Sequence, residues 1–513
     1  MSGTDRTYNA AVDMIDRNLT EGRSDKLAVI DDGGSYTYGE LARRVNRSAN
    51  LLQNMGLARE ARIAQIMLDT VDFPAVFWGA IKAGIIPVAL NTLLTPEQYQ
   101  GILNDCRAKV LFVSQALLPS VEPILGDLEF LETVVVTGGD AGAHTAYSKL
   151  FDTASDDFEA ASTNPDETAF WLYSSGSTGL PKGVLHRHTS LRFTADTYGK
   201  HVIAIAENDI VFSAAKLFFA YGLGNGMSFP FAVGATAVLM AERPTPDAVM
   251  KRLSDHNPTI FFGVPTLYGA MLADDACTPE NGSNKLRLLA SAGEALPGEI
   301  AKRLEKRFGV EVLDGIGSTE MLHIYMSNNA GSVCYDSSGV PVPGYTVRLV
   351  DEDGNDVPRG EIGELIVNGG SAADGYWNRR DKSGSTFRGP WTWSGDKFYQ
   401  DDDGFYHCCG RSDDMFKVSG IWVSPFEVEA ALLGHDSVME AAVVPHPDDE
   451  DLLKPKAFII FADGVNYDDG LFEELKEHVK TKVGPWKYPR WIEARTELPK
   501  TATGKIQRFK LHE

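Results

Sequence analysis

The chain has 513 residues, which at about 150 residues per domain predicts two to four domains with a large buried core. Its composition, with 43% hydrophobic and 23% charged residues, is typical of a globular protein. The formal net charge of −23 argues against nucleic acid as a partner, because phosphate contacts need clustered Lys and Arg.

The N-terminal part of the chain alternates between helical and strand patterns. Thr95 is followed by Pro96 and then by Gln98, which predicts a capped helix start. Such alternation predicts an α/β fold with parallel-rich sheets covered by helices. We expect helices at Tyr38–Met55 and Phe73–Ala83, and strands at Ala61–Leu68, Ile85–Ala89, Val110–Val113 and Thr133–Val136.

No membrane or export signal is visible in the sequence. The N-terminal residues lack the basic and then apolar run of a secretory signal. The longest apolar stretch, from Met227 to Ala241, contains Pro230 and Gly234 and is shorter than the ~20 residues that span a bilayer. We expect it to form buried strands.

Near residue 330 the pattern changes to short strands between turns rich in Gly and Asp, which predicts a β-rich subdomain. From Gly410 the chain returns to an α+β pattern. Ser424 and Glu427 have the spacing of a capping box ahead of a helix that reaches Leu433. The expected strands are Val347–Leu349, Gly363–Val367, Gly404–Cys408, Ala441–Val444 and Ala457–Phe461, and the last expected helix is Leu471–Val483.

The five cysteines are odd in number and scattered, and no pair has the spacing of zinc ligands. We therefore expect reduced, mostly buried thiols in a cytoplasmic protein. They are Cys106, Cys277, Cys334, Cys408 and Cys409.

The segment from Tyr173 to Gly183 interleaves hydroxyl residues with glycines and ends in Leu-Pro-Lys-Gly. Glycines let backbone N–H groups turn toward an anion, and Lys182 adds a positive charge. The spacing is not that of the common P-loop. A flexible surface loop is the alternative, but the position directly after an apolar strand favours polyphosphate binding.

Four later motifs are weak when taken singly. Glu320 after Ser-Thr has the chemistry of a Mg²⁺ ligand or of a solvated turn residue. Asp396 after Ser-Gly suits a ribose carboxylate contact or an Asx-turn. The other two are the stretch from Gly410 to Gly420, and Gly504-Lys505, whose lysine either reaches an anionic centre or sits in water.

The set of motifs in this order resembles the adenylate-forming superfamily of acyl-CoA ligases, luciferases and adenylation domains, over essentially the whole chain. Several segments are similar to its benzoate-CoA ligase branch, which includes benzoate and hydroxybenzoate ligases. These segments are Tyr8–Asp13, Asp72–Pro74, Ala83–Val88, Ser213–Asn225, Ser291–Leu296 and Thr319–Ile324.

The resemblance implies a large N-terminal domain, residues 1–412, that binds ATP and the acid. It implies a mobile C-terminal lid, residues 413–513, with its hinge at Asp413. Lys505 would bridge the carboxylate and the α-phosphate during adenylation. After a rotation of the lid, Gly420 would line the tunnel of the pantetheine arm.

The resemblance also implies the nucleotide contacts. Glu320 would bind Mg²⁺ together with Ser174, and Lys182 would act with Lys505 in catalysis. Asp396, with Arg411 near it, would bind the ribose, and Thr319 would contact the α-phosphate. The remaining expected contacts are Ser175, Gly176, Ser177, Thr178 and Gly179 on phosphate, Gly293, Asp314 and Gly315 around adenine, and Lys417 and Trp422.

The acid pocket implied by the resemblance contains Ala220, Tyr221, Gly317, His323 and Ile324. The stretch Leu217–Asn225 has no Asp or Glu, so an ammonium group would lie there unpaired. This absence favours a flat apolar ring over an amino acid. His323 either donates a hydrogen bond to a ring hydroxyl or only packs.

These features predict an ATP-dependent aromatic acid:CoA ligase that acts through an aroyl-AMP. Its partners would be an aromatic carboxylate, ATP with Mg²⁺, and CoA, in a cytoplasmic monomer or homodimer with no nucleic-acid or membrane partner. Three alternatives stay open: an adenylating enzyme that loads a carrier protein, a ligase for a non-aromatic acid, and a nucleotide-binding sensor without activity.

Overall fold

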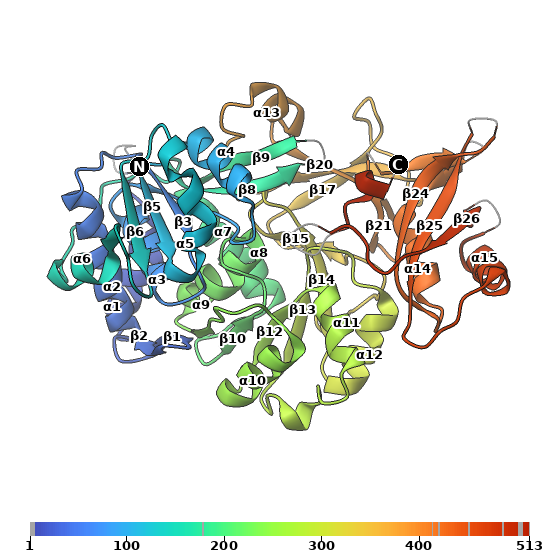
Figure 1. Cartoon of the computed structure of the whole chain (residues 1–513), viewed down its shortest axis with the longest axis horizontal. Helices are drawn as coiled ribbons and strands as arrows, with labels where there is room; N and C mark the ends of the chain where they lie inside the picture. The colour runs from blue at the N-terminus through green and yellow to red at the C-terminus, as the bar shows by residue number, and fades with distance from the viewer. Residues whose placement is uncertain are drawn as a thin grey trace.

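The computed structural model describes residues 6–176, 179–412, 414–418, 421–449, 452–484, 487–500 and 506–511. Two large sheets with their helices lie on one side, and a smaller α+β unit, orange to red, lies on the other (Figure 1). The predicted α/β fold is confirmed, with its parallel-rich sheets, β-rich subdomain and small C-terminal unit.

The first sheet has the strand order β7-β6-β5-β3-β4-β8-β9, and its pairs are parallel except for β8 with β9. Thr95 and Gln98 form the predicted capping box at the start of α4. The strands are β3 (Arg62–Ile66), β4 (Ile86–Ala89), β5 (Val110–Ser114), β6 (Thr133–Thr137), β7 (Thr145–Ala146), β8 (Thr168–Gly176) and β9 (Gly179–Arg187), with helices α2 (Tyr38–Asn54), α3 (Asp72–Lys82) and α4 (Pro96–Cys106).

The second sheet has the order β16-β15-β14-β13-β12-β10-β11-β1-β2, with a parallel centre and antiparallel strands at both ends. Helices α10 (Pro246–His256), α11 (Pro265–Ala273) and α12 (Gly298–Phe308) alternate with its strands. The strands are β1 (Leu27–Asp31), β2 (Gly34–Thr37), β10 (Ile210–Ser213), β11 (Thr236–Val238), β12 (Ile260–Gly263), β13 (Leu288–Ser291), β14 (Val312–Gly317), β15 (Ile324–Ser327) and β16 (Val340–Pro341).

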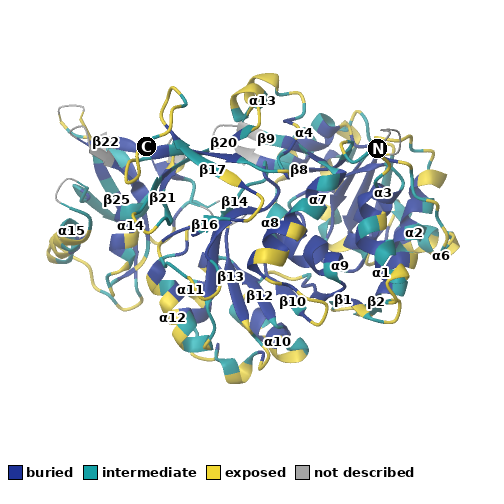
Figure 2. Ribbon diagram, turned by 180° about the vertical axis from the view of Figure 1, so that it is seen from behind, coloured by how far each residue is buried: buried dark blue, intermediate teal, exposed yellow. Residues whose placement is uncertain are grey.

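Helix α3 is buried on all sides, from Phe73 to Lys82, and its aromatic residues share one core with strands of both sheets. A helix that is apolar all round is stable only inside such a core. Lys82 is tolerated there because its Nζ lies 2.7 Å from Asp16 Oδ2. Seen from behind, the sheets are mostly buried and the exposed residues lie on the outer helices and loops (Figure 2).

The apolar run Met227–Ala241 does not form the strands that we expected over its length. Its first part continues a π-helical turn, η5 (Gly224–Ser228), into helix α9 (Phe229–Val233), and only β11 is a strand. Gly234 ends the helix with a left-handed φ of 77°. A short apolar run does not distinguish buried helix from buried strand, and here Pro230 in the first turn of α9 favours the helix.

The β-rich subdomain is an antiparallel sheet of β17 (Thr346–Val350), β18 (Gly363–Asn368), β19 (Phe387–Arg388), β20 (Trp391–Gln400) and β21 (Tyr406–Arg411). The C-terminal unit packs helices α14 (Pro425–Leu433) and α15 (Asp469–Val483) on β24 (Val438–Pro447), β25 (Leu453–Phe461) and β26 (Trp491–Ala494), beside the hairpin of β22 (Phe416–Val418) and β23 (Ile421–Val423).

Only half of the predicted capping box at Ser424 is formed. The Ser424 hydroxyl accepts a hydrogen bond from the Glu427 N–H, as expected for an N-cap. The Glu427 carboxylate instead pairs with Lys487 at 2.6 Å. The side chain therefore links α14 to the loop after α15.

The remaining helices are short, and all five cysteines are free, as predicted. Within the described residues, none of the helices is long and apolar enough to cross a membrane. The short helices are η1 (Val12–Asp16), α1 (Arg17–Thr20), η2 (Gln115–Leu117), α5 (Leu118–Val121), η3 (Glu122–Asp127), α6 (Tyr147–Thr153), α7 (His188–Thr194), η4 (Ala195–Val202), α8 (Ala220–Leu223), η6 (Pro279–Asn281), α13 (Arg380–Thr386) and η7 (Arg508–Leu511).

Candidate active site

The predicted phosphate segment is the hairpin of β8 and β9 rather than a long loop. The two strands pair as far as Ser174 with Lys182 and then, after a shift of register, Gly176 with Gly179. Ser174 Oγ is buried and has no hydrogen-bond partner among the described residues. Ser177 and Thr178 lie outside those residues, as does the side chain of Ser175.

Lys182 and Glu320 are joined through Tyr376. The Lys182 Nζ lies 4.3 Å from the centre of the Tyr376 ring, a cation–π distance. The Tyr376 hydroxyl donates to Glu320 Oε1 at 2.8 Å. Burial lowers the pKa of Lys182, the charge of Glu320 opposes this shift, and the charge of Arg411 adds to it. The site therefore combines an anion with partly desolvated cations.

The loop that carries Thr319 and Glu320 joins β14 to β15. Its backbone is fixed on both sides: the Leu322 N–H donates to Thr319 O, and the Ala373 N–H donates to Glu320 O at 2.8 Å. Ala373, three residues before Tyr376 in sequence, therefore ties the segment that carries Tyr376 to the backbone of Glu320.

Asp314 lies on β14 beside the loop that contains Gly293. Burial raises the pKa of Asp314 to about 8, although the Leu296 N–H donates a long hydrogen bond, 3.5 Å, to Asp314 Oδ2 and opposes the shift. Asp314 Oδ1 has no partner within the described part of the chain. Gly293 has a φ of 96°, in the left-handed region that favours glycine.

Gly315 and Gly317 are required by the close approach of β14 and β15. A Cβ atom on Gly315 would lie 2.8 Å from Met326 O, and one on Gly317 would lie 2.5 Å from His323 O. The resemblance assigned both glycines to ligand contacts. The close approach of the two strands explains by itself why neither position can carry a side chain.

Asp396 and Arg411 are cross-strand partners on β20 and β21. Arg411 Nη1 lies 3.2 Å from Asp396 Oδ1 and also donates to Ser394 O at 3.1 Å. Ser394 Oγ accepts from the Asp396 N–H, so the turn is closed by the serine and not by an Asx-turn of the aspartate. The Asp396 carboxylate is thus presented beside a guanidinium.

His323 is buried among aromatic rings. Its ring centre lies 4.5 Å from that of Phe229, 5.2 Å from Tyr198 and 5.5 Å from Tyr221. Its Nε2 lies 3.2 Å from Tyr221 O, so that this nitrogen carries the proton and donates. Burial lowers the pKa of His323 to about 3. The imidazole is therefore neutral at pH 7, and Nδ1 can only accept.

The other residues expected around the acid lie at the ends of two elements near His323. Ala220 and Tyr221 begin α8, and Ile324 begins β15. The Tyr221 hydroxyl and both side-chain atoms of Asn225 are buried without hydrogen-bond partners among the described residues. Apolar side chains around a few unpaired polar atoms are typical of the lining of a small-molecule site.

The expected lid residues are described only in part. Lys417 and Trp422 pair across the β22–β23 hairpin, but their side chains lie outside the described part of the chain. Asp413, Gly420 and Lys505 also lie outside it. On either side of residues 501–505, Lys500 and Ile506 pair in an antiparallel bridge.

Two comparisons with protein families cover most of the chain. Residues 16–377 match the family model of the AMP-binding enzyme, and residues 427–505 match that of the AMP-binding enzyme C-terminal domain.

The chain belongs to the AMP-binding enzyme family.

Relatives with full-length similarity support the resemblance to the benzoate-CoA ligase branch. This AMP-binding enzyme is 56% identical to the benzoate–CoA ligase of Thauera aromatica, over 98% of the chain and 95% of the relative. It is 52% identical to the 4-hydroxybenzoate–CoA/benzoate–CoA ligase of Rhodopseudomonas palustris, over 99% and 94%. A crystal structure of an anthranilate CoA ligase in complex with anthranoyl-AMP, 41% identical, superimposes with a TM-score of 0.94 over 99% of this chain and 98% of that one.

Two polar residues of this AMP-binding enzyme were missed by the sequence reasoning. Tyr376 lies 56 residues beyond Glu320 in sequence, and no local signal marks it. Asp69 is buried beside the segment that we described as free of acids, where its carboxylate accepts from the Leu217 N–H and lies 3.9 Å from Lys216 Nζ. Since Lys216 and the amide already compensate this charge, an ammonium ligand gains little from it.

Proposed function

We propose that the chain is an ATP-dependent aromatic carboxylic acid:CoA ligase of the benzoate or hydroxybenzoate type. The acid's carboxylate attacks the α-phosphorus of ATP and pyrophosphate leaves. The thiolate of CoA then attacks the aroyl carbonyl, and AMP leaves. The full-length identity to a benzoate–CoA ligase carries this proposal.

The β8–β9 hairpin and Lys182 bind the phosphates in this proposal. A carboxylate is repelled by the polyanionic nucleotide, and fixed cations offset that repulsion where charge develops. Lys182 is half-buried, so its charge acts through a medium less polar than water. Arg411 adds a second positive charge, and Asp396 beside it is placed to accept from the ribose hydroxyls.

Glu320 and Ser174 are the proposed Mg²⁺ ligands. They offer a carboxylate and a hydroxyl oxygen, the kind of ligand that Mg²⁺ prefers, and Ser174 Oγ is a buried atom without a partner among the described residues. Mg²⁺ bound there would offset charge on the phosphates. Tyr376 fixes one Glu320 oxygen and leaves the other for such a contact.

The aromatic ring of the acid lies in the pocket near Tyr221 and His323. The neutral imidazole adds no charge that would favour a second carboxylate. His323 Nδ1, as an acceptor, would take a hydrogen bond from a hydroxyl or amino substituent of the ring and would not donate one. The apolar walls around it would discriminate only weakly between close ring analogues.

The two-domain division at residues 412 and 413 is part of the proposal. The lid excludes water from the aroyl-AMP, which would otherwise hydrolyse. Lys505 serves adenylation, and Gly420, with Lys417 and Trp422 near it, serves the thioester step. We place the enzyme in the cytoplasm as a monomer or homodimer.

The test is the formation of AMP and acyl-CoA from Mg-ATP, CoA and separate acids. The panel is benzoate, its 2-, 3- and 4-hydroxy and amino derivatives, cinnamate and a short fatty acid. We expect turnover with benzoates and none with the fatty acid. Pyrophosphate release without acyl-CoA would indicate a carrier-loading enzyme, and no turnover with any acid would contradict the proposal.

A further inference from the structure

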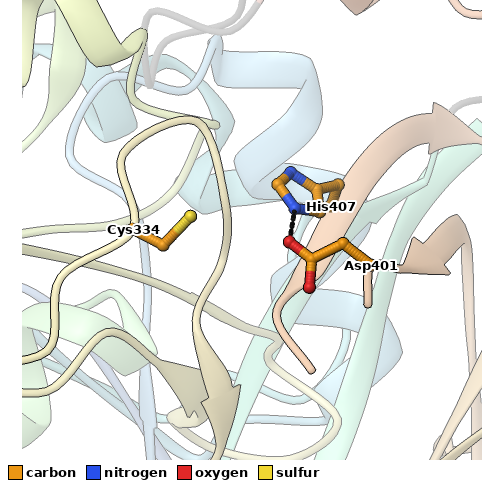
Figure 3. Close-up of side chains that lie close together, drawn as sticks. All are labelled: Cys334, Asp401 and His407. Carbon is orange, nitrogen blue, oxygen red and sulfur yellow. Dashed lines mark hydrogen bonds and ion pairs between the residues drawn. The ribbon is translucent and has the colours of Figure 1, made fainter. Parts of the chain in front are cut away.

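Cys334, Asp401 and His407 form a cluster outside the site described above. One potential ligand atom of each lies within 4.8 Å of the others. The Cys334 side chain points from the loop between β15 and β16 toward the imidazole and the carboxylate, which belong to the β20–β21 hairpin (Figure 3). Cys334 lies far from Asp401 and His407 in sequence, so the spacing of the cysteines could not predict the cluster.

The hydrogen bonds of His407 leave one of its nitrogens mismatched when the ring is neutral. Nδ1 lies 3.1 Å from Asp336 O, and Nε2 lies 2.7 Å from Asp401 Oδ2. A neutral imidazole has one N–H and one lone pair, so one lone pair faces an oxygen acceptor. Either a second proton or a cation bound at Nε2 removes the mismatch. With Nδ1–H donating to the carbonyl, Nε2 has the orientation found in metal-bound histidines.

Surrounding hydrogen bonds fix the backbone of Cys334 and the side chain of Asp401, and the Cys334 thiol donates only a long hydrogen bond, 3.9 Å, to Tyr335 O. The Cys334 N–H donates to Asn328 Oδ1 at 2.8 Å, and the Ser337 hydroxyl donates to Cys334 O at 2.7 Å. Asp401 Oδ1 accepts from the Phe405 N–H at 2.8 Å, which turns Oδ2 toward His407.

The imidazole plane is fixed as well. The ring of Tyr399 stacks on that of His407, with ring centres 4.8 Å apart. Ligands held by such outer contacts lose little conformational entropy on binding.

We propose that Cys334, Asp401 and His407 bind a Zn²⁺ ion, with water as the fourth ligand. Thiolate, imidazole and carboxylate are the ligands that Zn²⁺ takes in four-coordinate sites, where sulfur and nitrogen lie about 3.5 Å apart. The half-buried position leaves access for water. Binding converts the Cys334 thiol to a thiolate and releases its proton, so affinity rises with pH.

The ion would connect two parts of the chain. Cys334 belongs to the loop between β15 and β16 of the second large sheet. Asp401 and His407 lie at the turn of the β20–β21 hairpin, whose other end carries Asp396 and Arg411. The site is structural in this proposal: it fixes the hairpin and takes no part in the reaction.

Cobalt titration of the EDTA-treated full-length protein, without nucleotide, tests the proposal. Co²⁺ replaces Zn²⁺ and gives a thiolate-to-metal charge-transfer band in the near ultraviolet only when sulfur is a ligand. We expect a band that saturates at one Co²⁺ per chain and that Zn²⁺ abolishes. Zn²⁺ should also raise the Tm of the wild type.

Variants assign the band to the three ligands. Cys334→Ser should abolish it, and His407→Gln and Asp401→Asn should each weaken Co²⁺ binding by more than about tenfold. His435→Gln is the matched control, because His435 also pairs with a carboxylate, Glu474, at 3.4 Å. The proposal is overturned if the wild type gives no band, if Cys334→Ser keeps it, or if Glu320→Gln removes it.

Discussion

Tyr376 lies between two opposite charges, the Lys182 ammonium and the Glu320 carboxylate. Its hydroxyl binds Glu320 and its ring face meets the Lys182 ammonium. A direct Lys–Glu ion pair would neutralise both groups before a ligand arrives. With the phenol between them, the Lys182 ammonium stays available for the proposed phosphate contact and the Glu320 carboxylate for the proposed metal ion.

Tyr376→Phe tests this role, because it removes the hydroxyl and keeps the ring under Lys182. A hydrogen bond to a charged group contributes about 1.5–3 kcal/mol, so kcat/KM for benzoyl-CoA formation should fall by about tenfold or more. The assay is steady-state kinetics with varied Mg-ATP.

Tyr335→Phe is the matched control, since the Tyr335 hydroxyl donates to Glu305 at 2.6 Å outside the site. It should leave kcat/KM within about twofold of the wild type. Equal losses in the two variants would remove Tyr376 from the catalytic machinery.

At the scale of elements, the close pairing of β14 and β15 shapes the site. The strands bracket the Thr319–Glu320 loop, and β15 begins directly after His323, a residue of the proposed acid pocket. Gly317 is the tightest point of this pairing, because backbone atoms of His323 occupy the space that a side chain would need.

Gly317→Ala should therefore be destabilising and should displace His323. Overpacking of this kind costs about 1–3 kcal/mol, which calorimetry would record as a lower Tm. Gly384→Ala is the control, because Gly384 lies in α13 with no atom within 4 Å of its Cβ position. Alanine is the better helix former, so the control should keep or raise Tm. A normal Tm for Gly317→Ala would contradict the packing argument.

Local signals in the sequence predicted helices and strands. Contacts between residues that are distant in sequence could not be predicted. Thr95 capped α4 as its neighbours indicated, because a capping box is complete within four residues. The run after Met227 misled us, because apolar residues alone do not distinguish strand from helix. Tyr376 and Asp69 are distant in sequence from the motifs and lie near the site only because the chain folds. No motif could therefore include them. The predicted roles of Lys182 and Glu320 rested on a family resemblance, and the fold brings the two together.

At the scale of the whole molecule, the C-terminal segment is docked by a buried ion pair. Arg508 Nη2 lies 2.7 Å from Glu429 Oε2, and Arg508 also lies 3.6 Å from Asp414. Together with the bridge between Lys500 and Ile506, this pair fixes both ends of the segment that contains Lys505. The described residues on both sides of residues 501–505 are therefore anchored to the C-terminal unit.

Lys505→Ala should separate the two half-reactions. Removal of a fixed charge at the reacting centre costs about 10²–10³-fold, so benzoyl-AMP formation should fall by that factor. Thioester formation from supplied benzoyl-AMP should stay within a few fold of the wild type. Rapid-quench assays of each step measure both.

Lys500→Ala is the control, because Lys500 lies at the near end of the same segment and pairs with Glu440 at 2.7 Å at a half-exposed position. It should affect neither step strongly. If Lys505→Ala slowed both steps equally, the lid would not alternate between two arrangements as proposed.

The pair of Arg508 and Glu429 also bears on how the chain is made. Glu429 lies buried on α14, yet its partner Arg508 follows it by 79 residues in the chain and is therefore synthesised later. Domains fold largely in order of synthesis, so the N-terminal sheets can form early while this carboxylate waits for its guanidinium. A product that stops before Arg508 keeps an unpaired buried charge at Glu429, which costs several kcal/mol. A chain that lacks Arg508 would therefore have a less stable C-terminal unit, and proteases would cleave that unit more readily.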